Sequence, residues 1–462
     1  MNNYNFQFAH AYQGHWCIPV IGNDIPGILC IEKYSIHLDL FCNNTSKVVG
    51  KLEFETATGY AYAKDENNKS CYYFTLNELY CTNASWFGNK QSQYKFDVAS
   101  FTISDVKNVV KDGIRNICIR TKLLDKWVFN YTKSHFYYTI PSSNLESLKM
   151  EYTPKRSLVL YKTESMRVYI YFGFGVTTPS YSGYSMTTRS FLNIEFKNAI
   201  SFDEAFNTSE YFIWLLALLW NNMFYPDFVA FRTKESDFSY KQSNRYSHKY
   251  HDGENVTTIT DITDFPVKSF SSIINKWINL IDLFNDPLNT FFETKFNGHM
   301  SPLSIIKNHI STIDGLSANM QGASNGQVIK GKQKQDLDNI LTKIEKKLVE
   351  LELSKDDYNK LKTAALRDNK KALKERFSCL LQIIDNYVEC DLEQDFCEKA
   401  INTRNYYTHL KDKNDNMYSK KQFWDLSQCL EKIITAYVLN KIGIESKTAQ
   451  KTVRKISMKG EK

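Results

Sequence analysis

The spacing of apolar residues changes once along this chain, and that change limits the fold more than any other feature of the sequence. Up to about residue 200 the apolar residues alternate with polar ones in short runs, as in residues 34–40. Such alternation is typical of half-buried strands. From residue 267 onward apolar residues recur every three or four positions, as in residues 271–284, which is typical of amphipathic helices. We therefore expect an α+β protein in which a β-rich, sandwich or barrel-like domain (residues 1–265) precedes an all-α domain (residues 266–462).

Local patterns predict individual elements. Ser201 and Glu204 have the spacing of a capping box, so a helix is expected over residues 202–224. It contains the longest apolar run, residues 211–220, which has about half the length needed to cross a bilayer and is expected to be buried rather than in a membrane. Residues 230–265 are polar and are expected to be irregular. Strand patterns lie at residues 27–31, 34–40, 72–76, 95–103, 116–121, 127–140, 158–161 and 167–174, and helical patterns at 271–284, 301–319, 337–353, 356–363, 369–388, 394–410 and 421–442.

Cysteine usage and the first residues favour a cytoplasmic location. The ten cysteines include no C-x-x-C pair, and residues 1–16 lack the basic start and apolar core of a secretory signal. The thiols are therefore expected to be reduced. No phosphate-binding glycine loop occurs, and we expect no cofactor. His248, His251 and Asp252 could ligate a metal, but they lie in the stretch expected to be irregular, so no metal site is predicted.

The positive charge is confined to the end of the chain. The sequence has 58 Lys and Arg against 51 Asp and Glu, a net charge of +7. Residues 401–462 contain 13 basic and 6 acidic residues, which accounts for the whole net charge. A polyanionic partner is therefore expected to bind there.

One dense polar motif, TRNYYTH at residues 403–409, opens this basic segment. Asn405 and His409 are four residues apart and would share a helix face. Arg404 is about 140° around the helix from His409, so its long side chain would reach that face at a helix end or across a dimer interface. Arginine supplies a permanent cation for a phosphate, and histidine exchanges protons near neutral pH. The three residues could therefore cleave an RNA phosphodiester without a metal, although a salt bridge of Arg404 and a helix-capping His409 would explain them as simply.

The form R-N-x-x-x-H within residues 398–410 (EKAINTRNYYTHL) resembles the HEPN superfamily (higher eukaryotes and prokaryotes nucleotide-binding) and especially its ApeA-like branch of bacterial anti-phage abortive-infection proteins. Helical patterns before and after the motif, at residues 372–388 and 426–444, agree with that branch. Residues 14–16, 26–29 and the strand pattern that ends at residues 38–40 are similar to the opening of the ApeA N-terminal domain. The resemblance covers nearly the whole chain.

The resemblance implies a metal-independent endoribonuclease of anti-phage defence, acting as a homodimer or higher homo-oligomer whose copies contribute Arg404 and His409 to a shared cleft. The ribose 2′-OH would attack the adjacent phosphorus, with His409 as general base or acid, Arg404 stabilising the transition state and Asn405 orienting the histidine or the phosphate. The products would be a 2′,3′-cyclic phosphate and a 5′-OH, and DNA, which lacks the nucleophile, would survive. The expected partners are host or phage RNA, with tRNA as a candidate, and a phage-encoded trigger sensed by the N-terminal domain.

Residues around the motif are further candidates. Two tyrosines could stack on RNA bases, although packing is the favoured interpretation, and four lysines could contact the phosphate backbone: Tyr406, Tyr407, Lys411, Lys413, Lys420 and Lys421. Asp314 is a candidate for orienting His409. The alternative is a non-catalytic HEPN module that binds nucleotides, RNA or a partner protein and carries a ligand-binding β domain.

Overall fold

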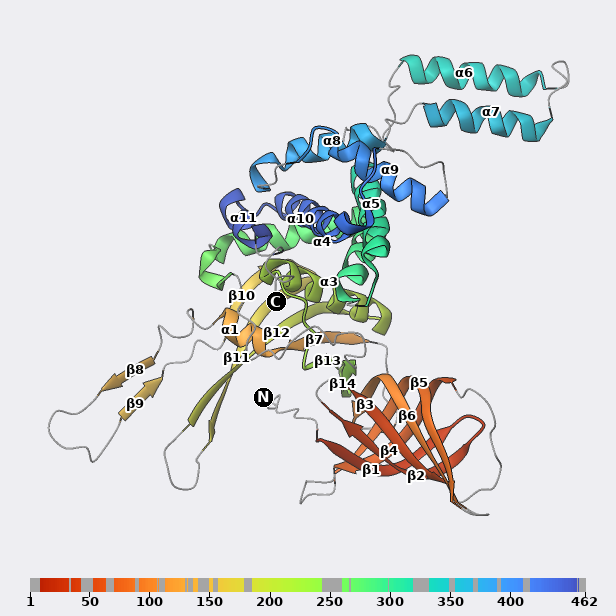
Figure 1. Ribbon diagram of the computed structural model, residues 1–462. Helices are drawn as coiled ribbons and strands as arrows, with labels where there is room; N and C mark the ends of the chain where they lie inside the picture. The colour runs from red at the N-terminus through yellow and green to blue at the C-terminus, as the bar shows by residue number, and fades with distance from the viewer. Residues whose placement is uncertain are drawn as a thin grey trace. The chain divides into compact units, whose positions relative to one another are not determined.

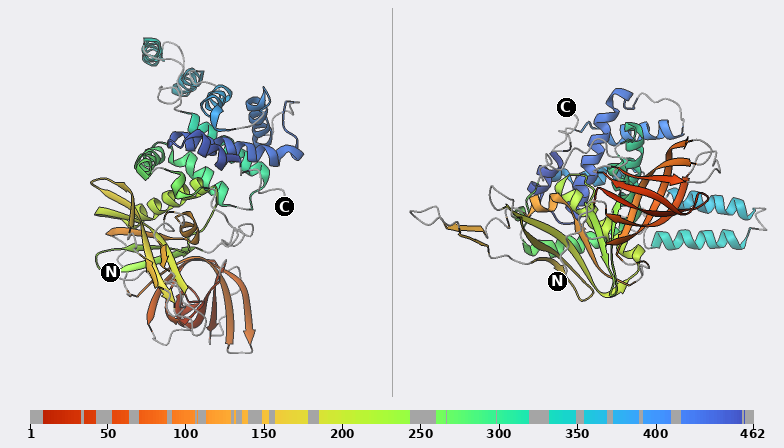
Figure 2. Two further views of the ribbon diagram at one scale, coloured as in Figure 1. Left: turned by 90° about the vertical axis from the view of Figure 1, so that its left-hand side faces the viewer. Right: turned by 90° about the horizontal axis from the view of Figure 1, so that it is seen from below.

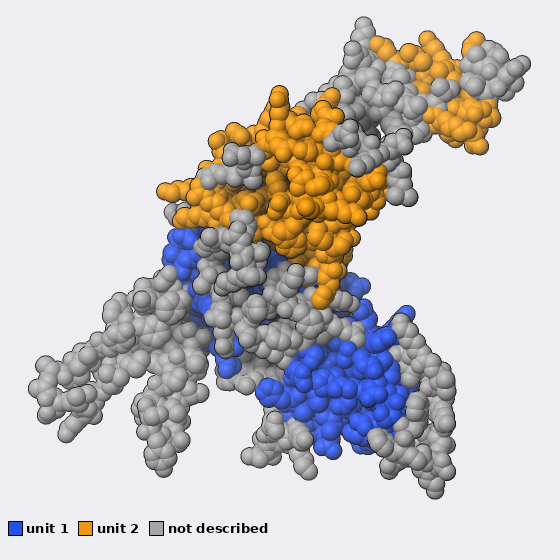
Figure 3. Space-filling model, viewed as in Figure 1, with its two compact units in different colours: residues 1–275 blue, residues 276–462 orange. Residues whose placement is uncertain are grey.

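The chain divides into two compact units, residues 1–275 and 276–462 (Figure 3). The computed structural model describes residues 9–462 except 33–34, 43–52, 64–69, 88–90, 106, 108–112, 129–130, 132–135, 140–148, 153–156, 178–184, 243–259, 266, 298, 319–331, 349–353, 369–372, 389–391, 410–415, 455 and 457–462.

Strands dominate the first unit and helices the second, which confirms the predicted α+β class (Figure 1). The strands are β1 Ala11–Ile18, β2 Gly22–Ile31, β3 Ile36–Cys42, β4 Glu53–Ala63, β5 Cys71–Phe87, β6 Gln91–Ser104, β7 Ile114–Arg120, β8 Phe136–Thr139, β9 Lys149–Tyr152, β10 Ser157–Lys162, β11 Met166–Thr177, β12 Ser185–Ile200, β13 Phe228–Arg232 and β14 Asp237–Gln242. The helices are α1 Lys122–Trp127, α3 Phe202–Trp220, α4 Val267–Phe296, α5 Pro302–Ser317, α6 Lys332–Lys346, α7 Lys355–Asp368, α8 Leu373–Ile383, α9 Phe396–His409, α10 Phe423–Lys441 and α11 Ser446–Arg454.

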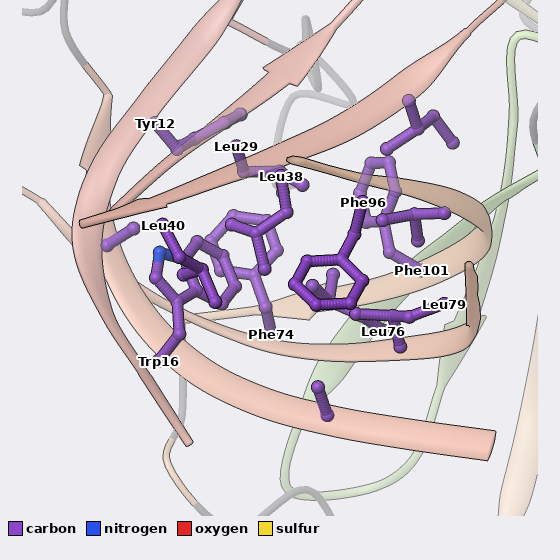
Figure 4. Packing of buried hydrophobic residues seen from close by; sticks show 14 of the residues in the cluster. Tyr12, Trp16, Leu29, Leu38, Leu40, Phe74, Leu76, Leu79, Phe96 and Phe101 are labelled. Atoms are coloured by element: carbon purple, nitrogen blue, oxygen red, sulfur yellow. The ribbon is translucent and has the colours of Figure 1, made fainter. Parts of the chain in front are cut away.

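Six antiparallel strands close into a barrel. The pairing runs β1–β2–β3–β6–β5–β4 and returns from β4 to β1, and Figure 2 shows the closed ring from two further sides. Because successive side chains of a strand point to opposite faces, every second residue enters the interior. Trp16, Leu38, Phe74, Phe96 and Phe101 fill it, and each is at most 3% exposed (Figure 4). The strand alternation read from residues 34–40 therefore corresponds to an inside and an outside of the barrel.

The same antiparallel sheet continues beyond the barrel. Strand β6 pairs with β14 through residues 100–104, and the order continues β14–β13–β7–β12–β11–β10. Helix α3 contacts β7 of this sheet. The predicted capping box is present at its start, where Ser201 Oγ accepts from Glu204 N and Glu204 Oε2 accepts from Ser201 N. The apolar run of residues 211–220 forms the buried end of this helix, as predicted.

A buried arginine joins two strands of this sheet to helix α1. Arg120 Nη1 donates to the carbonyl oxygens of Thr121 and Ser190, and Nη2 donates to Asp125 Oδ2. Asp125 Oδ1 in turn accepts from Ser190 N at 2.6 Å. The carboxylate of Asp227 lies 4.0 Å from Arg120 Nε, and burial raises its pKa against the attraction of the cation. The buried Arg120 therefore links β7, α1 and β12 through hydrogen bonds to the Asp125 carboxylate and to two carbonyl oxygens.

The second unit packs its helices around α10. Leu430, Ile433 and Ala436 of α10 are fully buried, and α10 contacts α5, α8 and α11. Ser301 caps α5, which lies within the helical pattern predicted for residues 301–319, and Gly443 has a φ of 82° after the end of α10. Helices α6 and α7 lie side by side as an antiparallel pair (Figures 1 and 2).

Several predicted elements are wrong in type or extent. Residues 230–232 and 237–242, expected to be irregular, belong to β13 and β14. Strand β13 has buried residues on both faces, so it lacks the alternation that identifies a strand. Trp127, expected in a strand, ends the short helix α1, which Thr121 caps. Helix α3 ends at Trp220 rather than 224, because Asn221 adopts a left-handed conformation.

Two other expectations concern the chain as a whole. No helix in the described ranges has both the length and the hydropathy that crossing a membrane requires. All nine cysteines in these ranges are free thiols, in agreement with the prediction. His248, His251 and Asp252 lie outside the described residues.

Candidate RNA-cleavage site

Helix α9 carries the R-N-x-x-x-H motif, and its apolar side fixes its position. Phe396, Ala400 and Thr403 recur every three or four residues and are at most 5% exposed. This side packs against α5 and α8 of the same unit. The residues that follow Thr403 are thereby turned toward the partly exposed sides of the helix.

The buried hydroxyl of Thr403 attaches the motif helix to the segment that follows it. Thr403 Oγ1 donates to Lys399 O at 2.7 Å and accepts from Tyr418 N at 2.9 Å. One residue earlier, Asn402 Nδ2 donates to Asn416 O at 3.3 Å. Residues 416–418 are therefore held along α9 directly beside the motif.

Arg404 and Asn405 form one hydrogen-bonded pair on the partly exposed side of α9. Arg404 Nη1 donates to Asn405 Oδ1 at 3.0 Å, and both side chains are half-buried. The amide oxygen restricts where the guanidinium can point, while the remaining guanidinium N–H groups keep the capacity to bind an anion. In the described structure, Asn405 thus orients the arginine.

His409 is the last residue of α9, and its side chain lies outside the described part. Five residues separate it from Arg404, which corresponds to about 7.5 Å along a helix and about 140° around it. Both residues lie in the C-terminal half of one helix, but on different sides of it.

The two tyrosines of the motif contact other aromatic rings. Tyr407 meets Phe423 of α10 edge to face, with ring centroids 5.3 Å apart, and Tyr406 meets Tyr407 at 4.7 Å. Both tyrosines are half-buried. These contacts agree with the favoured interpretation of the tyrosines as packing residues.

A lysine that sequence reasoning missed lies at the same helix end. Lys307 of α5 donates through Nζ to the carbonyl oxygen of Tyr407 at 3.0 Å, and its side chain is half-buried. The last four carbonyls of a helix lack partners within the helix, so a cation there is favourable. Lys307 and Tyr407 are 100 residues apart in the sequence, so no local sequence pattern predicts that they meet.

The other predicted residues are distributed unevenly. Lys420 and Lys421 are exposed in a short 3-10 turn, residues 420–422, next to the segment that Thr403 holds. Lys411 and Lys413 lie outside the described residues. The carboxylate of Asp314 accepts a hydrogen bond from Arg376 of α8, so its described partner is an arginine.

The N-terminal unit contains a separate cavity of about 530 Å³ at the barrel. His15, Asp24 and Tyr60 form part of its wall, together with Trp16, Thr75 and Lys107. His15 Nδ1 lies 3.1 Å from Asp24 Oδ1, and its ring stacks on Tyr60 with centroids 5.6 Å apart. The cavity therefore combines aromatic surface with charged and hydroxyl groups, as small-molecule sites do.

Comparison with known families identifies both units. Residues 308–448 match the family model described as Apea-like HEPN, and residues 11–284 match the model described as ApeA N-terminal domain 1. The first match contains the whole of α9 with Arg404, Asn405 and His409. Comparisons with curated proteins and with solved structures gave no significant match.

Proposed function

The chain belongs to the ApeA-like HEPN family, and on this basis we propose that it is a metal-independent endoribonuclease of anti-phage defence. The family suggests anti-phage defence and a HEPN nuclease, and HEPN domains are generally ribonucleases. The observation that carries the proposal is the motif in α9, within the HEPN match, with Arg404 hydrogen-bonded to Asn405 and His409 ending the same helix.

The proposed reaction needs only RNA and these side chains. His409 accepts the proton of a ribose 2′-OH, whose oxygen bonds to the adjacent phosphorus. The bond from phosphorus to the 5′-oxygen breaks, and this oxygen takes up a proton from a histidine acting as acid. Arg404 stabilises the charge of the five-coordinate phosphorus. The products are a 2′,3′-cyclic phosphate and a 5′-OH, with DNA resistant because it has no 2′-OH.

A homodimer or higher homo-oligomer completes the proposed site. Since Arg404 and His409 lie about 140° apart on α9, one copy presents them poorly to a single phosphate. Two copies with their α9 helices facing each other would place an arginine from one beside a histidine from the other. Light scattering on the purified chain should give the mass of a dimer or a larger assembly, and a monomer active at the same concentration would contradict this arrangement.

The proposed substrate is RNA, with tRNA as the first candidate, and the exposed Lys420 and Lys421 support binding of its backbone. Lys411, Lys413, Tyr406 and Tyr407 remain candidates for RNA contacts. The N-terminal unit would sense a phage-encoded trigger, and a cytoplasmic location follows from this role.

Cleavage of total RNA in EDTA tests the proposal. The full chain should cut RNA and leave 5′-OH ends, while His409→Ala and Arg404→Ala should lower the rate by about 100-fold or more. His299→Ala is the matched control, because His299 is an exposed histidine of the same unit outside the motif. Equal cutting by His409→Ala would refute the site, and complete loss of wild-type cutting in EDTA would refute the metal-independent mechanism.

The alternative function, a non-catalytic binding module, is supported by the cavity beside His15 and Asp24. It predicts that the His409→Ala protein and the wild type bind RNA or a partner equally and that neither cleaves RNA. The cleavage assay above separates the two functions directly.

A further inference from the structure

A cysteine, a histidine and an aspartate meet on the outer face of the barrel. None of them lines the cavity or belongs to the motif helix. Their ligand atoms, on Cys30, His37 and Asp39, all lie within 4.8 Å of one another. Among the residues that the structure describes, this is the one group of three or more His, Cys, Asp or Glu side chains that meets this criterion.

The strand register produces the cluster. Cys30 of β2 stands directly opposite His37 of β3, and Asp39 follows His37 by two residues on the same face. The alternate residues Leu29, Leu38 and Leu40 point into the barrel and are fully buried, as Figure 4 shows. The three polar side chains therefore emerge on a surface whose backbone is fixed on both strands by the packed core.

The geometry suits a small divalent ion. Metal–ligand bonds of about 2.0–2.3 Å at tetrahedral angles place ligand atoms about 3.3–3.8 Å apart. Side chains whose atoms already lie within 4.8 Å reach such spacing by small rotations on a fixed backbone. The side chain of His37 is 13% exposed, and Cys30 and Asp39 are partly buried, so the group is sheltered but open to an ion.

The donor set selects the kind of ion. One thiolate, one imidazole and one carboxylate are ligands that Zn²⁺ accepts, whereas Mg²⁺ and Ca²⁺ prefer oxygen alone. The thiolate and the carboxylate together carry two negative charges, which a divalent ion cancels. Glu32 Oε1 lies 3.8 Å from His37 Nε2, beyond hydrogen-bond distance, and adds a further negative charge near the site.

We propose that Cys30, His37 and Asp39 bind one Zn²⁺ ion on the outer face of the barrel, with a water molecule completing the coordination. The ion connects β2 to β3 through side chains in addition to their backbone hydrogen bonds. The site is independent of the proposed RNA cleavage, since it lies in the other unit and none of its residues belongs to the motif helix.

Zinc binding to the full chain tests the site. After equilibrium dialysis with low micromolar Zn²⁺, the wild type should hold about one zinc per chain, and Cys30→Ser and His37→Ala should each lower this at least tenfold. His10→Ala and Cys81→Ser form the matched control, because they replace the same residue types in the same unit, outside the cluster and outside the cavity lining. Equal zinc content in the Cys30→Ser protein, or none in the wild type, would overturn the proposal.

Cobalt substitution tests it without relying on a variant that has to fold. Co²⁺ bound to the wild type should give a thiolate-to-cobalt charge-transfer band, and Zn²⁺ should displace it. Absence of the band would overturn the proposal. Loss of zinc from a His248→Ala/His251→Ala protein would also overturn the proposal, because that result would assign the ion to residues 248–251. The Cys30→Ser protein should still cleave RNA in EDTA, because the proposed nuclease needs no metal. The zinc proposal and the nuclease proposal can therefore fail independently of each other.

Discussion

Replacing Thr403 with valine should release the segment that is attached to the motif helix. Valine keeps the shape of the buried side chain but removes the acceptor for the Tyr418 N–H, which Thr403 Oγ1 now accepts at 2.9 Å. Thr403 is fully buried, so no water replaces the hydroxyl without rearrangement. A buried N–H left without a partner costs about 1–3 kcal/mol. With about 2 kcal/mol, local opening around Tyr418 becomes about 30-fold more frequent, since about 1.4 kcal/mol corresponds to a factor of ten.

Hydrogen–deuterium exchange measures this opening directly. The Tyr418 amide of the Thr403→Val protein should exchange about 30-fold faster than in the wild type, while the Thr403→Ser protein, which retains the hydroxyl, should stay within a few-fold. Amides in the middle of α10 serve as an internal reference because their burial is unrelated to Thr403. An unchanged Tyr418 amide in the valine variant would show that this hydrogen bond does not hold the segment. Equal acceleration in the serine variant would attribute the effect to the lost methyl group.

Three further substitutions test packing and charge elsewhere. Arg120→Met should lower the free energy of unfolding by about 3 kcal/mol, because it removes the cation hydrogen-bonded to Asp125 and to two buried backbone carbonyl oxygens; urea denaturation measures this loss, and an unchanged midpoint would contradict it. Burial lowers the pKa of His309 to about 4 from the usual 6.5. The wild type should therefore lose about 3 kcal/mol of unfolding free energy as the pH falls from 6.5 to 4, because the unfolded chain takes up a proton first. In denaturation curves of His309→Phe, this part of the pH dependence should vanish. Gly315→Ala should lower the stability measured by thermal unfolding by about 1–3 kcal/mol. Alanine has the higher helix propensity, but its new Cβ would clash with Pro287 Cγ of α4. A gain in stability would show that α4 can move aside.

Features that depend on neighbouring residues could be predicted from the sequence. The Ser201 capping box involves residues three positions apart, and it is present. The motif helix was likewise predictable, since Phe396, Ala400 and Thr403 have helical spacing. The strand β3 followed from its alternation, because one side of it faces a packed interior.

Features that join distant segments could not be predicted. Closure of the barrel needs β1 to pair with β4 as well as with β2, and the alternation of apolar residues does not reveal which strands are partners. Lys307 reaches the end of α9 from 100 residues away, so its role depends on tertiary packing. The pairing of Arg376 with Asp314 is similar, because only the contact between α5 and α8 brings an arginine to a carboxylate that seemed available for His409.

Helix α4 determines how this protein can be divided in experiments. The boundary between the compact units, at residues 275 and 276, falls inside the first part of this helix, before the kink at Phe284. Phe270 near its start packs on Trp127, and Trp277 packs on Phe292, which lies beyond the kink. A fragment ending at residue 275 would expose the buried Ile273 and Ile274 on an unfinished helix, and one beginning at 276 would start in mid-helix without a cap. Separately expressed halves are therefore expected to aggregate, and the roles of the two units are better separated by point substitutions in the intact polypeptide.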